Sequence, residues 1–118
     1  TITIDMFGNA FYQPRDYYAV SHGRVNILIP NNAIKSFNKK TSLFFVAQLS
    51  KLKNFYSYSY MLTSKRIGNE KITLPTINNQ IAFDFMQDLM TALSKQVVHA
   101  LNAYTSLKIQ TAKEVINK

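Results

Sequence analysis

The sequence of 118 residues has no cysteine, three glycines, and no apolar run near the ~20 residues that a membrane-spanning helix needs. The lack of cysteine excludes disulfides and zinc–thiolate sites, and it is compatible with a reducing cytoplasm. No signal peptide is visible, so we expect a cytoplasmic protein that does not enter a membrane. The glycines, at positions 8, 23 and 68, do not form a phosphate-cradling pattern.

Acidic residues and histidines are also scarce, with six Asp or Glu and two His. His22 is expected in a turn and His99 on a helix, and neither has a second ligand at metal spacing. Asp84 and Asp88 lie four residues apart, where helix-start charge explains them better than acid–base catalysis does. We therefore expect no catalytic residues, no metal site and no cofactor. An enzyme with an unrecognised site is the least favoured alternative.

Basic residues are abundant, and they give the chain a net charge of +8. Residues 1–83 hold ten Lys or Arg and three Asp or Glu, whereas residues 84–118 hold four and three. The excess positive charge therefore belongs to the first part of the chain. A basic globular surface favours a polyanionic partner, most often nucleic acid. A solvated surface that only aids solubility remains an equal alternative on charge alone.

The hydrophobic pattern predicts an α+β fold, with a small mixed sheet and a packed helix followed by one long C-terminal helix. Asn38 is a plausible N-cap for a helix that extends to residue 55. Residues 76–80 are the only candidate for a linker. Turns are expected at residues 7–9, 22–23 and 68–69, and strands over residues 1–5, 10–13, 17–21, 24–30 and 71–75.

A single helix is predicted from residue 83 to residue 117, with Asn79 or Asp84 as its cap. A helix of about 34 residues is ~50 Å long, which exceeds the small domain beside it. We therefore expect part of it to project and to pair with another helix; the alternative is a helix folded wholly back on its own domain. Its apolar residues recur in steps of four and three, as in a coiled-coil seam. The predicted seam consists of Met86, Met90, Leu93, Val97, Ala100, Tyr104 and Leu107.

Basic and aromatic residues occur together in the stretch YSYSYMLTSKR, residues 56–66. If this stretch begins as a strand, Tyr56, Tyr58 and Tyr60 share one face, which is more often core than contact surface. The second half, MLTSKR, is then an exposed basic turn. Ammonium and guanidinium groups bind phosphates without reading sequence, whereas Arg, Asn and Gln can also reach base edges.

Three consecutive stretches carry a family resemblance: FGNAFYQPRDYYAVSHGRVNILIP, TSLFFVAQLSKLKNFYSYSYMLTSKRIGNEKITLP and TINNQIAFDFMQDLMTAL. In this order they resemble the target recognition domains of restriction–modification specificity subunits. The resemblance implies a non-catalytic component that binds a specific double-stranded DNA sequence, in a Type I system or a fused Type II enzyme. It also implies methyltransferase and endonuclease subunits as partners.

The resemblance further implies how the chain is organised. Residues 1–80 would be the C-terminal part of a recognition domain, so we expect the chain to be a fragment of a larger protein. Residues 81–118 would be a spacer helix that self-associates or pairs with a second recognition domain and docks the methyltransferase. The predicted DNA-binding residues are Gln13, Arg15, Lys39, Lys40, Tyr60, Ser64, Lys65 and Arg66. The alternative function is an assembly protein that dimerises through its long helix, with an incidental basic surface.

Overall fold

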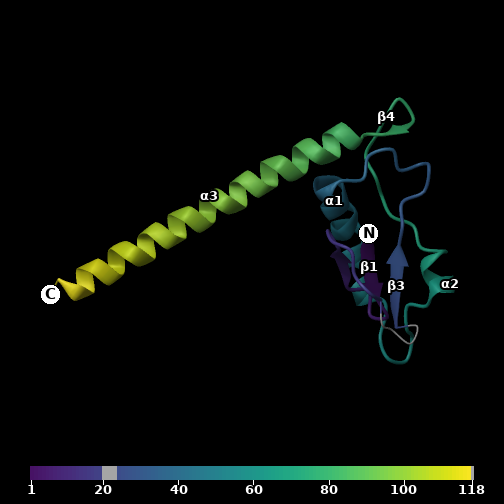
Figure 1. The fold of residues 1–118 in the computed structure, drawn as a ribbon, viewed down its shortest axis with the longest axis horizontal. Helices are drawn as coiled ribbons and strands as arrows, with labels where there is room; N and C mark the ends of the chain where they lie inside the picture. The colour runs from purple at the N-terminus through teal and green to yellow at the C-terminus, as the bar shows by residue number, and fades with distance from the viewer. Residues whose placement is uncertain (20–23, 118) are drawn as a thin grey trace.

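A computed structural model describes residues 1–19 and 24–117 of the chain. Figure 1 shows a small body of strands and short helices from which one long helix projects. The molecule measures 63 × 41 × 28 Å along its principal axes. The predicted α+β class is confirmed.

Three short strands form an antiparallel sheet in the order β2-β1-β3. They are β1 (Ile2–Asp5), β2 (Ala10–Tyr12) and β3 (Val25–Leu28), so strands predicted at residues 1–5, 10–13 and 24–30 are confirmed. In the register, Ile4 of the central strand lies opposite Ala10 and Asn26. A further strand was predicted over residues 17–21. The structure describes residues 17–19 of this range, and they are not in a strand, so the prediction is wrong for them. Its end and the turn at residues 22–23 lie outside the described residues.

Two apolar residues of the alternating pattern in β3 lie on the outer face of the strand. Val25 and Ile27 are exposed, whereas Asn26 and Leu28 point inward and are half-buried. The Asn26 side chain is satisfied there because its Nδ2 donates to the Leu62 carbonyl oxygen at 3.2 Å. Alternation therefore predicted the strand correctly, but the apolar side chains do not mark its inner face.

A helix packs against the inner face of this sheet, as predicted. α1 (Lys39–Leu49) continues into the 3-10 turn η1 (Ser50–Asn54). Asn38 caps α1 with a capping box, since its Oδ1 accepts from the Lys40 and Thr41 backbone N–H groups at 3.0 and 3.1 Å. The core between helix and sheet contains Ile2, Ile4, Ala10, Phe44, Phe45, Leu49, Leu52, Tyr56, Leu62 and Met86.

Residues 55–81 differ most from the prediction. Residues 57–60 form a tight turn closed by a single bridge between Ser57 and Tyr60, not a strand. The expected basic turn contains a short helix, α2 (Ser64–Ile67), whose N-cap is Thr63. No strand forms over residues 71–75, and the turn at residues 68–69 is confirmed. These runs are too short for periodicity to identify them, so tertiary packing sets their structure.

The predicted linker at residues 76–80 is instead part of a small hairpin. β4 (Thr76–Ile77) pairs with β5 (Gln80–Ile81) through a turn at Asn78 and Asn79. Both asparagines have positive φ, 52° and 61°, as a two-residue hairpin turn of type I′ requires. Asn tolerates this conformation better than most residues do.

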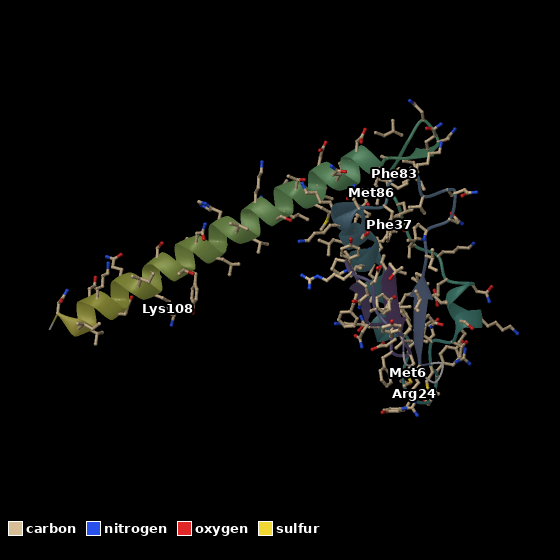
Figure 2. All side chains as sticks on the ribbon, viewed as in Figure 1. Met6, Arg24, Phe37, Phe83, Met86 and Lys108 are labelled. Carbon is tan, nitrogen blue, oxygen red and sulfur yellow. The ribbon has the colours of Figure 1, made fainter. Side chains whose placement is uncertain are left out.

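The long helix α3 (Phe83–Ile116) agrees with the predicted helix to within one residue. Its N-cap is Ala82, without a side-chain hydrogen bond, so the prediction of Asn79 or Asp84 as the cap is wrong. Met86 is completely buried in the body and Met90 packs against the same core. Figure 2 shows Phe83 and Met86 near Phe37, where the helix leaves the body.

Beyond Met90 the helix projects away from the body, as predicted (Figure 1). The remaining seam residues are exposed, from 44% of Leu93 to 63% of Leu107. The alternative of a helix folded wholly back on its domain is therefore wrong. The pairing of the projecting part with another helix stays a prediction.

Candidate nucleic-acid interface

The predicted DNA-binding residues lie in two groups on different elements of the body. One group follows the segment after Tyr60, which is anchored where β1 ends: the Leu62 N–H donates to the Met6 carbonyl oxygen at 2.8 Å. This group contains Tyr60, Ser64, Lys65 and Arg66. Arg24 lies at the same end, since Val25 pairs with Asp5, the last residue of β1 (Figure 2).

The other group lies where β1 begins. The Gln13 N–H donates to the Thr1 carbonyl oxygen at 2.8 Å, and Gln13 Nε2 donates to Thr3 Oγ1 at 3.0 Å. The neighbouring Tyr12 ring packs edge-on against Phe37, at 6.5 Å between centroids, just before the start of α1. This end of the sheet therefore holds Gln13, Arg15, Lys39 and Lys40.

Lys40 also faces the long helix. It borders a cavity of about 470 Å³ together with Lys95 and His99 of α3. Its ammonium group is thus part of a positive surface between α1 and α3, away from the segment that follows Tyr60. The structure brings Lys40 beside Lys95 and His99 of the long helix, and no pattern in the sequence groups these residues.

Arg66 is fixed by an aromatic ring and a backbone carbonyl. Its guanidinium carbon lies 3.7 Å from the centroid of the Tyr60 ring, in a cation–π contact. Its Nη1 donates to the Met61 carbonyl oxygen at 2.6 Å. Because the side chain is already ordered, less conformational entropy is lost when the guanidinium binds a ligand.

The ring under Arg66 is itself supported. Tyr60 stacks on Tyr56 with 5.6 Å between centroids and 9° between planes. The Tyr56 hydroxyl donates to the Glu70 carboxylate. A continuous stack, formed by Arg66, Tyr60, Tyr56 and Glu70, thus connects the half-buried Arg66 to the core. Hereafter this set is called the arginine–tyrosine stack.

The hydrogen bond to Glu70 also sets the protonation of Tyr56. It raises the pKa of the Tyr56 hydroxyl to about 12, with further contributions from burial and from the negative charge of the carboxylate. Arg66 opposes this increase through its positive charge. The hydroxyl therefore remains a neutral donor to Glu70 well above physiological pH.

The three tyrosines do not share one face, contrary to the prediction. Tyr56 is 8% exposed, Tyr58 is 80% exposed, and Tyr60 lies between these extremes. The tight turn rotates Tyr58 to the opposite side, where its ring meets Phe7 edge-on at 5.0 Å between centroids. The interpretation of the tyrosine face as core is correct for Tyr56 and wrong for Tyr58.

A cavity of about 490 Å³ opens beside the arginine–tyrosine stack. Tyr56, Tyr60 and Glu70 of the stack line it, together with Lys51 and Phe55 from the end of η1 and with Lys71. Lys51 and Lys71 were visible in the sequence as members of the basic excess, but they are twenty residues apart. Only their packing around one cavity distinguishes them from the other lysines.

Within residues 1–19 and 24–117, no group of three or more His, Asp or Glu side chains is placed to hold a metal ion. No helix in that part of the chain is long and apolar enough to cross a membrane.

These features define a class of protein. A basic end with aromatic side chains and an ordered arginine, on a small α+β body with a projecting helix, suits recognition of a polyanion within a larger assembly. The family model of the Type I restriction modification DNA specificity domain matches residues 1–103. The chain belongs to this family, as the resemblance of its motifs indicated.

Membership of the family gives the chain a DNA-recognition role in a restriction–modification system. No match was found among curated proteins or among solved structures. The residues that contact DNA are therefore inferred from the chemistry and geometry of this structure.

Proposed function

We propose that this chain is the non-catalytic component that reads a specific double-stranded DNA sequence and directs a methyltransferase, with its endonuclease, to that sequence. The observation that carries the proposal is the arginine–tyrosine stack, which orders the Arg66 side chain next to the exposed Lys65. Arginine is the side chain best suited to guanine, because it donates two parallel hydrogen bonds to O6 and N7.

The residues around Arg66 take different roles in this proposal. Lys65 is exposed on the same short helix and contacts phosphates, which adds affinity without sequence preference. Ser64, exposed at the start of α2, is a candidate for phosphate or base contact. Tyr60 supports Arg66 from below and contributes its exposed edge.

The second group of residues binds the DNA backbone at another position in this proposal. Gln13 and Arg15 follow β2, and Lys39 and Lys40 begin α1, whereas Arg66 lies on α2. Contacts from both groups would fix the orientation of the body on a duplex, because phosphate contacts position a protein even when they carry no sequence information.

The projecting part of α3 is the proposed assembly element. Its exposed apolar seam, from Leu93 to Leu107, is suited to pairing with a second helix and to docking the methyltransferase. The same exposed seam favours the second candidate function, an assembly protein whose basic surface is incidental. The two candidates differ in whether Arg66 and Lys65 affect binding to DNA.

The test is the binding of duplex DNA by the complete restriction–modification assembly. Fluorescence anisotropy measures this binding at several salt concentrations. Arg66→Lys keeps the charge but loses the planar fork, so affinity for the target duplex falls by ~1–3 kcal/mol while the salt dependence is kept. Lys65→Gln weakens binding to the target duplex and to unrelated duplexes by the same factor. It also lowers the slope of log affinity against log salt by about one.

Exposed Lys108, far along the projecting helix, provides the matched control: Lys108→Gln leaves both affinities unchanged. An assembly that shows no preference for duplex DNA at low salt contradicts the proposed function. Unchanged binding in both Arg66→Lys and Lys65→Gln favours the assembly protein with an incidental basic surface.

A further inference from the structure

The cavity beside the arginine–tyrosine stack has a lining that the proposed roles of Arg66 and Lys65 do not use. One wall is the end of α1 and η1, with Lys51 and Phe55, and the facing wall is the segment from Glu70 to Thr73. Its volume of about 490 Å³ lies in the range of small-molecule sites, and a single nucleotide fits within it.

Two ammonium groups at this cavity favour a phosphate. Lys51 Nζ donates to Gln48 Oε1 at 2.9 Å, which holds the ammonium group at the rim of the cavity. An ammonium group has three donors, so Lys51 retains two for the oxygens of a ligand. Lys71 lines the same cavity and is exposed, so both ammonium groups are available to an anion bound there.

The aromatic side chains favour a planar ring. Phe55 lines the cavity and yet is 71% exposed, which leaves most of its ring open to contact. Tyr60 lines the same cavity and is held in place by the arginine–tyrosine stack. Every nucleobase has a face that stacks on an open aromatic ring, so Phe55 suits a base without selecting its sequence. Tyr60, which is stacked with Arg66 and Tyr56, offers only its edge.

Glu70 distinguishes a nucleotide from a simple anion. Its carboxylate accepts a hydrogen bond from Tyr56 and still has capacity for another donor. The exocyclic amino group of cytosine, adenine or guanine supplies such a donor, whereas thymine has no amino group and offers only its ring N3–H. A free phosphate or an acidic peptide would meet the negative charge of Glu70 without this compensation.

We propose that this cavity binds one unpaired nucleotide of the DNA, with its base against Phe55 and its phosphate at Lys51 and Lys71. Glu70 then accepts from the amino group of the base, so amino-bearing bases bind more tightly than thymine. The inference rests on the proposed DNA-binding function, and it adds a separate site next to Arg66. A base inside an intact duplex cannot reach such a cavity, so the ligand is an extrahelical or single-stranded nucleotide.

The experiment compares three duplexes of the same target sequence in the complete assembly. One is fully paired, one carries a single extrahelical cytosine, and one carries a single extrahelical thymine. We expect the cytosine duplex to bind about tenfold more tightly than the paired duplex, with thymine between them. Equal affinities for the paired duplex and both extrahelical duplexes overturn the proposal.

Two variants test whether the preference for extrahelical cytosine comes from the cavity or from a general preference for flexible DNA. Phe55→Leu removes the stacking ring from an exposed position and abolishes the preference for extrahelical cytosine, while paired-duplex binding is retained. Phe11→Leu is the matched control, since Phe11 is 58% exposed on β2 and does not line the cavity. We expect the Phe11→Leu variant to keep the preference for extrahelical cytosine. A preference that survives Phe55→Leu overturns the proposal.

The contribution of Glu70 is tested by Glu70→Gln, which keeps an acceptor for Tyr56 but removes the negative charge. We expect the difference between cytosine and thymine to shrink severalfold in this variant. Paired-duplex binding in the wild type reports on the proposed function independently. If that binding is present and the extrahelical preference is absent, only the nucleotide site is contradicted; if no duplex binds at all, the proposed function also fails.

Discussion

Single side chains at this interface gain their positions from neighbours that are distant in the sequence. Arg66 lies over Tyr60, Tyr60 stacks on Tyr56, and the Tyr56 hydroxyl donates to Glu70. A lysine at position 66 would have no planar group to stack in this way, so the stack on Tyr60 depends on arginine. Tyr56 contributes in two ways, because its ring lies in the core and its hydroxyl orders Glu70.

Tyr56→Phe tests the role of that hydroxyl in stability. Removing the hydrogen bond to Glu70 should lower the free energy of unfolding by about 1 kcal/mol at neutral pH. Because the pKa of Tyr56 is raised from 10.0 to about 12 in the folded protein, the folded state holds the proton more tightly than the unfolded state does. The stabilisation is therefore complete below pH 10 and is lost as the pH rises towards 12.

Denaturant unfolding of the two proteins between pH 7 and pH 12 measures this effect. The difference between wild type and Tyr56→Phe should be constant up to about pH 10 and then shrink. Tyr58→Phe is the control, since Tyr58 is exposed and should show no difference at neutral pH. A Tyr56→Phe protein that is as stable as wild type at pH 7 would contradict the role of this hydrogen bond.

Among the elements, the turn between β1 and β2 holds the sheet against η1. The Asp5 carboxylate accepts from the Phe7 and Asn9 backbone N–H groups, both at 2.9 Å, which forms the turn. Gly8 lies at φ +86° within it, and a Cβ there would be 2.7 Å from the backbone nitrogen of Lys53. The turn thus requires glycine both for its conformation and for the close approach of η1.

Gly8→Ala should therefore destabilise the protein by about 1–3 kcal/mol or more, since strain at positive φ adds to a clash with backbone atoms. Gly68→Ala is the matched control, because Gly68 is at φ −62° and an added Cβ would have only ordinary contacts at 3.5 Å. Thermal unfolding of both variants measures the difference. Equal melting temperatures for Gly8→Ala and wild type would show that the turn relaxes without cost.

The whole molecule is a small body with one helix extending far beyond it. The 34 residues of α3 correspond to ~51 Å at 1.5 Å per residue, against a longest dimension of 63 Å for the molecule. Only the first turns, through Met86 and Met90, pack on the body. An exposed apolar seam on a helix of this length is costly unless another surface covers it.

Replacing Leu93 and Val97 together by Asp should weaken self-association or subunit docking, because the predicted pairing would bury two charges in the seam. Both residues are exposed in the single chain, so the body should keep its stability. Sedimentation of the assembly measures the change. The control replaces His99 and Asn102 by Asp, on the opposite side of the same helix, and should leave the assembly intact. An unchanged oligomeric state in the Leu93 and Val97 variant would contradict the coiled-coil seam.

Local signals in the sequence determined the elements that are long or sharply bounded. The cap at Asn38 defined the start of α1, and uninterrupted helical periodicity defined α3 to within one residue. The alternating pattern located β1, β2 and β3, although Val25 and Ile27 of β3 are exposed and do not face the core. Signals of this kind act within a few residues of the chain, so they need no knowledge of tertiary contacts.

Tertiary structure decided the rest of the interface. Residues 57–60 form a tight turn that is closed by the bridge between Ser57 and Tyr60. The short helix α2 forms after it, where the sequence predicted an exposed turn. That arrangement puts Arg66 over Tyr60 and brings Lys51, Phe55 and Lys71 around one cavity. The sequence determined that the chain is basic and which motifs it carries. Which cations share a surface depends on packing between distant segments, which short-range patterns do not encode.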